Sequence, residues 1–270
     1  MRELNVAVVQ MLPELSKMED NVGKMSEMVT RIATAQPVDI IVFPELAVTG
    51  YEGGARFAQM AQRVPGAVTN ILGQRATEFG VYLLIGMAVK EDVETVLYNG
   101  AVLIAPDGEV AGQYRKIHLP AEERLVFRPG YQIKPFETEI GTLGVMTGWD
   151  LAFPEMARSL MLSGAEIILL PAAWQAGEAD MWRTLLVARA YENDTFIAAA
   201  NRIGEEPSYV FAGQSAILAP SGEVLAALEE PEEGYVVVRL DLDEVRHRRE
   251  ESQVMLARQP AAYRPIVRKY

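Results

Sequence analysis

The sequence predicts a single α/β domain, and three features of its pattern support this fold class. Short apolar runs such as residues 5–10 alternate with amphipathic stretches such as residues 22–32, whose apolar side chains recur three and four positions apart. The chain has 270 residues, 50% of them hydrophobic, which is enough to bury a large core. No internal repeat or Gly-, Ser- or Pro-rich linker divides it, so we expect one domain over residues 1–270.

The elements are expected in the following order. Continuous apolar runs indicate strands buried on both faces, period-3.6 stretches indicate helices, and Gly, Pro and Asp mark their ends, as in the turn at residues 106–108. The expected strands are residues 5–10, 39–43, 81–89, 97–105, 144–147, 167–170 (ending before Pro171), 195–200, 215–218, 224–227 and 235–240. The expected helices are residues 22–32 (opening near Asp20 or Asn21), a segment around 68–72 closed by Gly80, 153–162, 181–193, and a short one from about Asp241.

The last twenty residues differ from the rest. Residues 251–270 lack clear periodicity but keep apolar and aromatic side chains. We expect a C-terminal tail without an element of its own, packing on the body or on a partner subunit.

Composition excludes several classes of function. The net charge of −12 and the absence of a basic stripe disfavour nucleic acid and anionic membrane surfaces as partners. The chain has no cysteine and two histidines, so we expect no disulfide, metal site or metal cofactor, and nucleotide-binding motifs are missing too. The first apolar run is too short for a signal peptide or a membrane span, which favours a soluble, cytoplasmic protein.

Three segments are each interpreted as a buried strand that ends in polar or bulky residues, and ligands bind at such strand ends in open α/β sheets. Glu45 directly follows the apolar run at residues 39–43, and partial burial would raise its pKa towards that of a general base. Lys116 lies in a bulky segment, where a buried ammonium could stabilise an oxyanion. Taken singly, each has a simpler interpretation, as a turn-capping carboxylate and a solvated lysine.

A third segment, residues 144–155, predicts a strand, a tight turn and a helix. This arrangement presents a nucleophile beside backbone N–H groups. Gly148 stands at the turn, and glycine offers no attacking atom. The adjacent Thr147 should face the other side of the strand, and its hydroxyl is a weaker nucleophile than a thiol.

In this order the segments resemble the nitrilase (carbon–nitrogen hydrolase) superfamily, from about Val6 to Tyr263. The motifs that carry the resemblance are Pro44-Glu45 with Tyr51, Arg115-Lys116-Ile117-His118-Leu119, Gly148-Trp149-Asp150 with Phe153-Pro154-Glu155, Leu170-Pro171-Ala172-Ala173-Trp174, residues 188–193, residues 201–204, and Phe211-Ala212-Gly213-Gln214-Ser215 with Pro220-Ser221-Gly222. An Asp after Trp149 is more similar to the amidase and carbamoylase branches than to true nitrilases.

The resemblance implies a four-layer α-β-β-α sandwich, assembly into a homodimer or higher homo-oligomer, and cofactor-free hydrolysis of a non-peptide C–N bond by a Glu-Lys-Cys triad. It gives Glu45 the role of general base and Lys116 that of oxyanion stabiliser. The second glutamate of the family, which orients the substrate and holds the lysine, matches Glu123, with Glu122 as the alternative. Trp149 would lend its backbone N–H to the oxyanion, and the position of the family's cysteine falls on Gly148.

Without a thiol we expect the chain to be inactive as sequenced, because losing a nucleophile costs about 10⁶ in turnover. One interpretation is an amidase whose cysteine was replaced, deliberately or recently; the retained charged residues favour it, since they are costly to bury. The other is a natural pseudoenzyme that binds a metabolite or protein. A scaffold without a working pocket would instead hold the tips of Glu45 and Lys116 more than about 7 Å apart.

The expected substrate is a small amide or an N-carbamoyl compound. Trp174 follows a strand end and either walls the pocket or belongs to the core. Arg189 and Glu192, three apart on a helix, are expected to pair with each other rather than with substrate.

Overall fold

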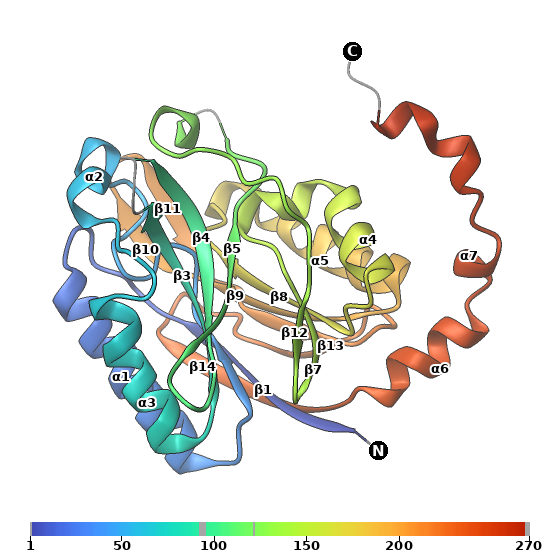
Figure 1. Cartoon of the computed structure of the whole chain (residues 1–270), viewed down its shortest axis with the longest axis horizontal. Coiled ribbons are helices and arrows are strands. Elements are labelled where there is room, and N and C mark those ends of the chain that lie inside the picture. Colours follow the sequence, from blue (N-terminus) through green and yellow to red (C-terminus); the bar gives the residue numbers. More distant parts are fainter. Residues whose placement is uncertain (1, 92–95, 121, 268–270) are drawn as a thin grey trace.

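The computed structural model of the chain describes residues 2–91, 96–120 and 122–267 and has two six-stranded sheets at its centre. Helices cover the outer face of each sheet (Figure 1). The strand order of the first sheet is β14 (Gly234–Asp241), β1 (Glu3–Gln10), β2 (Ile40–Val42), β3 (Tyr82–Lys90), β4 (Leu97–Ile104) and β5 (Val110–Arg115). That of the second is β13 (Val224–Ala227), β12 (Ala216–Leu218), β9 (Phe196–Asn201), β8 (Ile167–Ala172), β7 (Gly141–Val145) and β6 (Phe136–Thr138). The predicted α-β-β-α sandwich is confirmed.

The helices form where the sequence pattern predicts them, with small differences at their ends. Helix α1 (Met18–Ala35) begins slightly earlier than expected and buries the apolar face that its spacing predicts. Helix α3 (Ala67–Phe79) ends at Gly80, whose φ of 66° lies in the left-handed region that glycine adopts without strain. On the second sheet, α4 (Pro154–Leu162) starts with a proline in its first turn, and α5 (Ala179–Asn193) follows.

The central strands of each sheet run parallel, which brings their carboxyl ends to one edge. Strand β2 pairs in parallel with β1 and β3, and β8 with β7 and β9. Strand β5 runs in the same direction as β3, because both flank β4 antiparallel. Ile40 and Val42 of β2 face the core between the sheets, whereas Ile41 faces the core beneath α1 and α3, so both faces of this strand are buried. This explains its unbroken apolar run.

Strand β8 continues past the end predicted for it. Strand β8 continues through Pro171 to Ala172, with Pro171 opposite Ala200 of β9. The proline therefore did not end the strand, although it cannot donate a ladder hydrogen bond.

Smaller elements lie in the loops that connect the strands of the two large sheets. The hairpin β10 (Ile203–Glu206) and β11 (Tyr209–Ala212) forms a separate two-stranded sheet. Helix α2 (Phe57–Met60) and short 3₁₀ turns complete the loops. These turns are Gly54–Arg56, Glu123–Leu125, Gly148–Ala152 and Ala176–Glu178.

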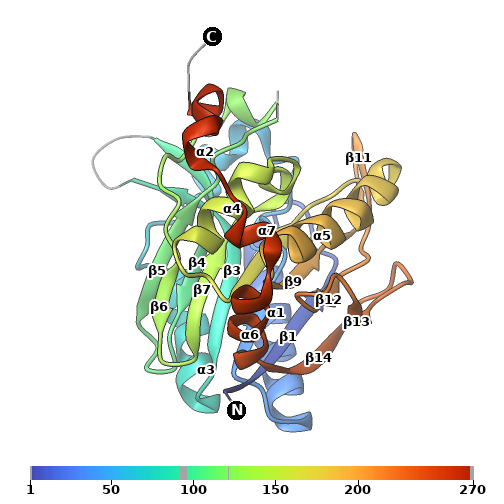
Figure 2. The ribbon, with the colours of Figure 1, turned by 90° about the vertical axis from the view of Figure 1, so that its right-hand side faces the viewer.

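The C-terminal tail has elements of its own, contrary to the prediction. After α6 (Asp243–Glu251) come α7 (Gln253–Leu256) and a 3₁₀ segment, Pro260–Val267. These helical turns form because they let neighbouring backbone groups hydrogen-bond to each other. The Ala257 N–H, for example, donates to the Gln253 carbonyl at 2.9 Å. The tail arcs past α4 and α5 (Figures 1 and 2) and encloses with them a cavity of about 290 Å³. Its apolar side chains stay largely in solvent: Leu256 is 67% exposed.

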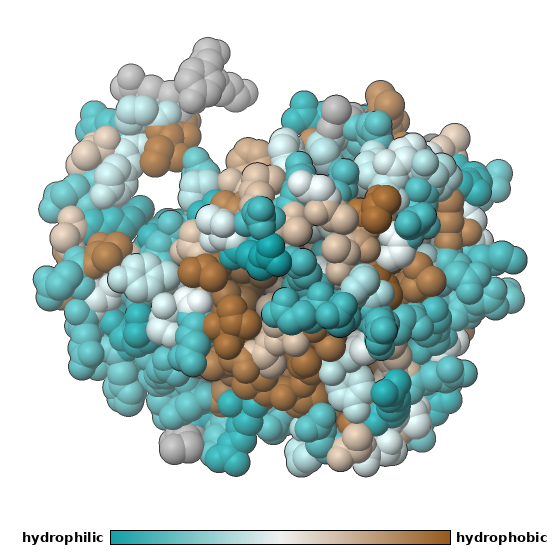
Figure 3. Space-filling view, turned by 180° about the vertical axis from the view of Figure 1, so that it is seen from behind, coloured by the Kyte–Doolittle hydropathy of each residue, from teal (hydrophilic) through white to brown (hydrophobic). Residues whose placement is uncertain are grey.

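Among the described residues, none of the helices combines the length and apolarity needed to span a bilayer. Apolar side chains gather on the face shown in Figure 3. This face is the right-hand side of the molecule in Figure 2, where β13 and β14 lie. Val224 and Leu225 of β13 are 50% and 39% exposed.

Candidate active site

The three residues singled out at strand ends lie against one another. Glu45 follows β2, Lys116 follows β5 and Gly148 follows β7. The Lys116 ammonium donates to Glu45 Oε1 at 2.6 Å, and a Cβ atom placed on Gly148 would be 2.1 Å from Glu45 Oε2. The tips of Glu45 and Lys116 are thus in direct hydrogen-bond contact, which rules out the scaffold hypothesis that required them to be far apart.

A second carboxylate completes the contacts of the lysine. Lys116 Nζ also donates to Glu123 Oε1 at 2.6 Å, and Glu123 is buried in the 3₁₀ turn Glu123–Leu125. Glu122, the alternative, is exposed and contacts the hydroxyl of Tyr209 instead. Of the two neighbouring glutamates, Glu123 is the one that holds the lysine.

Uncharged donors fix both carboxylates in place. Asn99 on β4 donates to Glu45 Oε1 at 2.7 Å and to Glu123 Oε2 at 3.1 Å. The Tyr51 hydroxyl donates to Glu123 Oε1 at 2.8 Å, and the backbone N–H of Ala173 donates to Glu45 Oε2 at 3.0 Å. The sequence analysis missed Asn99, although an amide inside the apolar run of β4 was a signal of a buried polar contact.

Burial decides the electrostatics of this cluster. Desolvation raises the pKa of Glu45, against the opposing pull of the Lys116 charge. Burial alone would lower the pKa of Lys116, but the carboxylates of Glu123 and Glu45 outweigh it and hold that pKa above its usual value. Burial and the same carboxylates raise the pKa of Tyr51, which therefore stays a proton donor. The Lys116 ammonium therefore lies between the buried side chains of Glu45 and Glu123.

The turn at Gly148 is held by a buried aspartate. Gly148 has φ +50°, in the left-handed region where a side chain is strained. Asp150 accepts hydrogen bonds from the Thr147 N–H at 3.1 Å, the Tyr114 hydroxyl at 2.6 Å and the His118 N–H at 2.9 Å. The His118 ring Nδ1 lies 2.9 Å from the same carboxylate. This aspartate therefore ties the turn to the segment that carries Lys116.

Removing the charge of Asp150 should therefore loosen the turn. Asp150→Asn replaces one acceptor oxygen by an N–H₂ group that faces other donors, and we expect it to lower the free energy of unfolding by about 2 kcal/mol. Urea unfolding followed by circular dichroism measures this. Asp180→Asn is the matched control, since Asp180 is exposed and pairs only with Arg183; it should change stability by less than about 0.5 kcal/mol. Equal losses in the two variants would contradict the role of Asp150.

A cavity of about 200 Å³ opens onto this cluster. Its lining consists of Glu45, Tyr51, Lys116, Pro120, Trp149, Ala173, Trp174, Gln175 and Glu178. Both tryptophans that the sequence analysis named are among them. Trp174 was expected either to wall the pocket or to belong to the core, and it does both. It lines the cavity, and its ring centroid lies 5.5 Å from that of Trp182 in the core.

Two charged residues of α5, which were predicted to pair with each other rather than with substrate, do so. Arg189 and Glu192 form an ion pair at 3.0 Å, and Arg189 also donates to the backbone carbonyls of Leu151 and Ala152. These contacts fix the end of the turn that begins at Gly148. Neither side chain lines the cavity.

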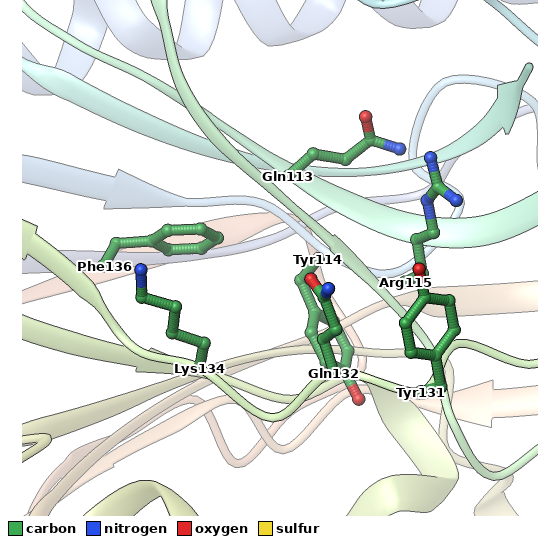
Figure 4. A pocket seen from close by; sticks show the side chains of 7 residues that line it. All are labelled: Gln113, Tyr114, Arg115, Tyr131, Gln132, Lys134 and Phe136. Atoms are coloured by element: carbon green, nitrogen blue, oxygen red, sulfur yellow. The ribbon is translucent and has the colours of Figure 1, made fainter. Parts of the chain in front are cut away.

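A second groove lies along strand β5, away from the glutamate–lysine cluster. It has a volume of about 260 Å³ and contains no carboxylate (Figure 4). Its lining consists of Gln113, Tyr114, Arg115, Tyr131, Gln132, Lys134 and Phe136. Within the described residues, no three His, Asp or Glu side chains cluster in a way that could hold a metal ion.

Comparison with known proteins agrees with the geometry. A model of the family described as carbon-nitrogen hydrolase matches residues 5–250. A probable nitrilase of Schizosaccharomyces pombe is 37% identical over 245 residues, which cover 90% of each chain. An N-carbamoylputrescine amidase of Solanum lycopersicum is 32% identical over 266 residues, covering 90% of this chain and 88% of that protein.

The fold is also found among solved structures. A mutant of the amidase from Nesterenkonia sp. AN1 has a TM-score of 0.85 and 27% identity, covering 97% of this chain and 96% of that one. That structure shows covalent addition of the acetamide moiety of fluoroacetamide at its active-site cysteine.

Proposed function

The chain belongs to the carbon–nitrogen hydrolase family, and from this premise we propose that its cavity is an amide-hydrolysing site whose nucleophile position is held by Gly148. One observation carries the proposal: Lys116 bridges Glu45 and Glu123 at 2.6 Å on the wall of a cavity, and Gly148, which is not among the lining residues, lies against Glu45. The proposed substrate is a small amide or an N-carbamoyl compound, since a cavity of about 200 Å³ is smaller than the roughly 300 Å³ at which sites for drug-sized ligands begin.

Each side chain has a step in the proposed reaction. The substrate carbonyl oxygen points at the Lys116 ammonium and the Trp149 backbone N–H, which stabilise the oxyanion. With a thiol at position 148, Glu45 takes the thiol proton, sulfur attacks the carbonyl carbon, and the proton passes to the nitrogen that leaves as ammonia. Water then cleaves the thioester. Glu123 acts through Lys116, which it orients. The cysteine adduct in the Nesterenkonia amidase supports one part of this proposal, a nucleophilic thiol in the active site of that relative.

As sequenced, the chain has no thiol, and we propose that it binds such amides without turning them over. The same geometry also favours a second candidate function, that of a natural pseudoenzyme that uses the pocket for binding alone. The observation on its side is that Glu45 Oε2 occupies the space that a side chain at position 148 would need. Restoration of ammonia release by Gly148→Cys tests the first candidate. A thermal-shift screen of the unmodified chain with metabolites tests the second.

Assembly and location belong to the same proposal. We propose a homodimer or higher homo-oligomer in the cytoplasm. Light scattering coupled to size-exclusion chromatography measures the assembly, and a monomer would contradict it.

The proposed base should set the acid limit of activity. In a Gly148→Cys variant, kcat/KM should fall on acidification through a pKa above 4.5, the ordinary value for glutamate, because Glu45 must be ionised and burial raises its pKa. Asn99 hydrogen-bonds to the ionised form, so adding Asn99→Ala should move this acid limb to still higher pH. An acid limb at or below 4.5 in the folded variant would contradict Glu45 as the base.

A further inference from the structure

The mouth of the cavity carries a carboxylate that the proposed reaction does not use. Glu178 lines the cavity and ends the 3₁₀ turn Ala176–Glu178, directly before α5. Its backbone carbonyl accepts a hydrogen bond from the Trp174 indole at 3.2 Å, so the turn is tied to the wall of the pocket. Within the described part of the chain, its carboxylate has no ion pair or hydrogen bond. The lining of the cavity therefore includes an exposed acidic residue whose carboxylate has no partner among the described residues.

The balance of charge around the cavity is negative. Lys116 is the one cation among the described residues that line it, and its ammonium is bound to Glu45 and Glu123. It therefore leaves Glu178 uncompensated. A substrate with a distal carboxylate would meet repulsion here, because the described lining residues include no arginine or histidine and no lysine besides Lys116, which is already bound. A distal ammonium would meet attraction.

Two indole rings strengthen this preference. Trp149 and Trp174 line the same cavity as Glu178. The faces of tryptophan rings attract cations through their negative quadrupole, and more strongly than those of tyrosine or phenylalanine. A methyl group in the same place would gain apolar contact with the rings but nothing from the carboxylate.

Resting on the function proposed above, we propose that this pocket selects small amides or N-carbamoyl compounds whose far end carries an ammonium group. The amide is held at Glu45 and Lys116, and the ammonium lies by Glu178 between Trp149 and Trp174. Because Glu178 is exposed, its ion pair with the substrate should contribute about 2- to 5-fold in affinity. Contact with the rings should contribute a similar factor.

Three amides of matched shape test the proposal. They are 5-aminopentanamide, hexanamide and adipic acid monoamide, which differ only in ending in an ammonium, a methyl or a carboxylate group. Titration calorimetry on the unmodified chain gives their dissociation constants, and ammonia release by Gly148→Cys ranks the same three by kcat/KM. We expect the ammonium compound to exceed hexanamide by about 5- to 20-fold and the carboxylate compound to be the weakest.

Two variants assign the preference to Glu178. Glu178→Gln should reduce the preference for ammonium over methyl by about 2- to 5-fold. Asp180→Asn should keep it, because Asp180 is an equally exposed carboxylate two residues away that does not line the cavity.

The outcomes separate this inference from the proposed function. The inference is wrong, while the hydrolase proposal stands, if hexanamide or the carboxylate compound ranks first by dissociation constant or by kcat/KM. The same holds if Glu178→Gln keeps the full preference for the ammonium compound. If none of the three binds and Gly148→Cys also releases no ammonia from a broad amide panel, both are overturned.

Discussion

Replacing Gly148 with cysteine is expected to raise ammonia release from small amides by up to about 10⁶-fold over the unmodified chain. The reason is that base, oxyanion cation and second carboxylate are already in contact at 2.6 Å, so that the substitution supplies the one missing atom. Removing a nucleophile from an assembled triad typically costs about this factor. A coupled assay for ammonia, run with a panel of aliphatic amides and N-carbamoyl compounds, measures the gain.

The new side chain has to displace Glu45. Its Cβ would lie 2.1 Å from Glu45 Oε2, and the left-handed φ of +50° adds strain of about 1–3 kcal/mol. The atom in the way is the tip of a flexible side chain, which can rotate, and the strain resembles that of other nucleophile turns. We therefore expect the variant to fold with a lower melting temperature and still to gain activity.

Gly148→Ala is the matched control, because it displaces Glu45 and strains the turn equally but adds no nucleophile. It should show the stability loss without ammonia release. Adding Glu45→Gln to Gly148→Cys should abolish the gain, since no base then takes the thiol proton. A folded Gly148→Cys protein that is inert across the whole panel would refute the amidase proposal.

Much of the architecture was readable from the sequence because local pattern and tertiary structure agree. The apolar run at residues 39–43 predicted a buried strand, and the two sides of β2 do face different cores. Gly80 predicted the end of α3, and its left-handed φ is the physical reason. Pro171 was misleading, since it was taken to mark the end of a strand that in fact continues to Ala172.

The site could be predicted only in part. The order of the motifs predicted that Glu45 and Lys116 belong to one site. It could not predict which groups outside the motifs the fold would bring there. Asn99 lies near the start of β4 and reaches both carboxylates only because β4 pairs with β5, which ends directly before Lys116. Asp150 was read as part of a motif, whereas its hydrogen bonds to Tyr114 and His118 are a product of tertiary packing.

Lys116→Met is expected to lower the free energy of unfolding at pH 7 by about 3–5 kcal/mol. The variant removes the cation between two buried carboxylates, and breaking a buried ion pair from one side leaves uncompensated charge. Because a domain is stable by only about 5–15 kcal/mol, such a loss brings the protein close to unfolding. Lys134→Met is the control, since Lys134 is exposed and should change stability by less than about 0.5 kcal/mol.

The pH dependence of the Lys116→Met variant gives the sharper test. Burial already raises the pKa of Glu45 above 4.5, and losing the ammonium that lowers it should raise this pKa further. Between the unfolded pKa and this higher folded pKa, the native state binds more protons than the unfolded state, so its stability increases as the pH falls. The deficit relative to the unmodified chain should therefore shrink on acidification towards pH 4.5. Adding Glu45→Gln removes one buried charge and should recover part of the loss at pH 7. A deficit that grows in acid, or stays below about 1 kcal/mol at pH 7, would show that the buried carboxylates do not depend on Lys116.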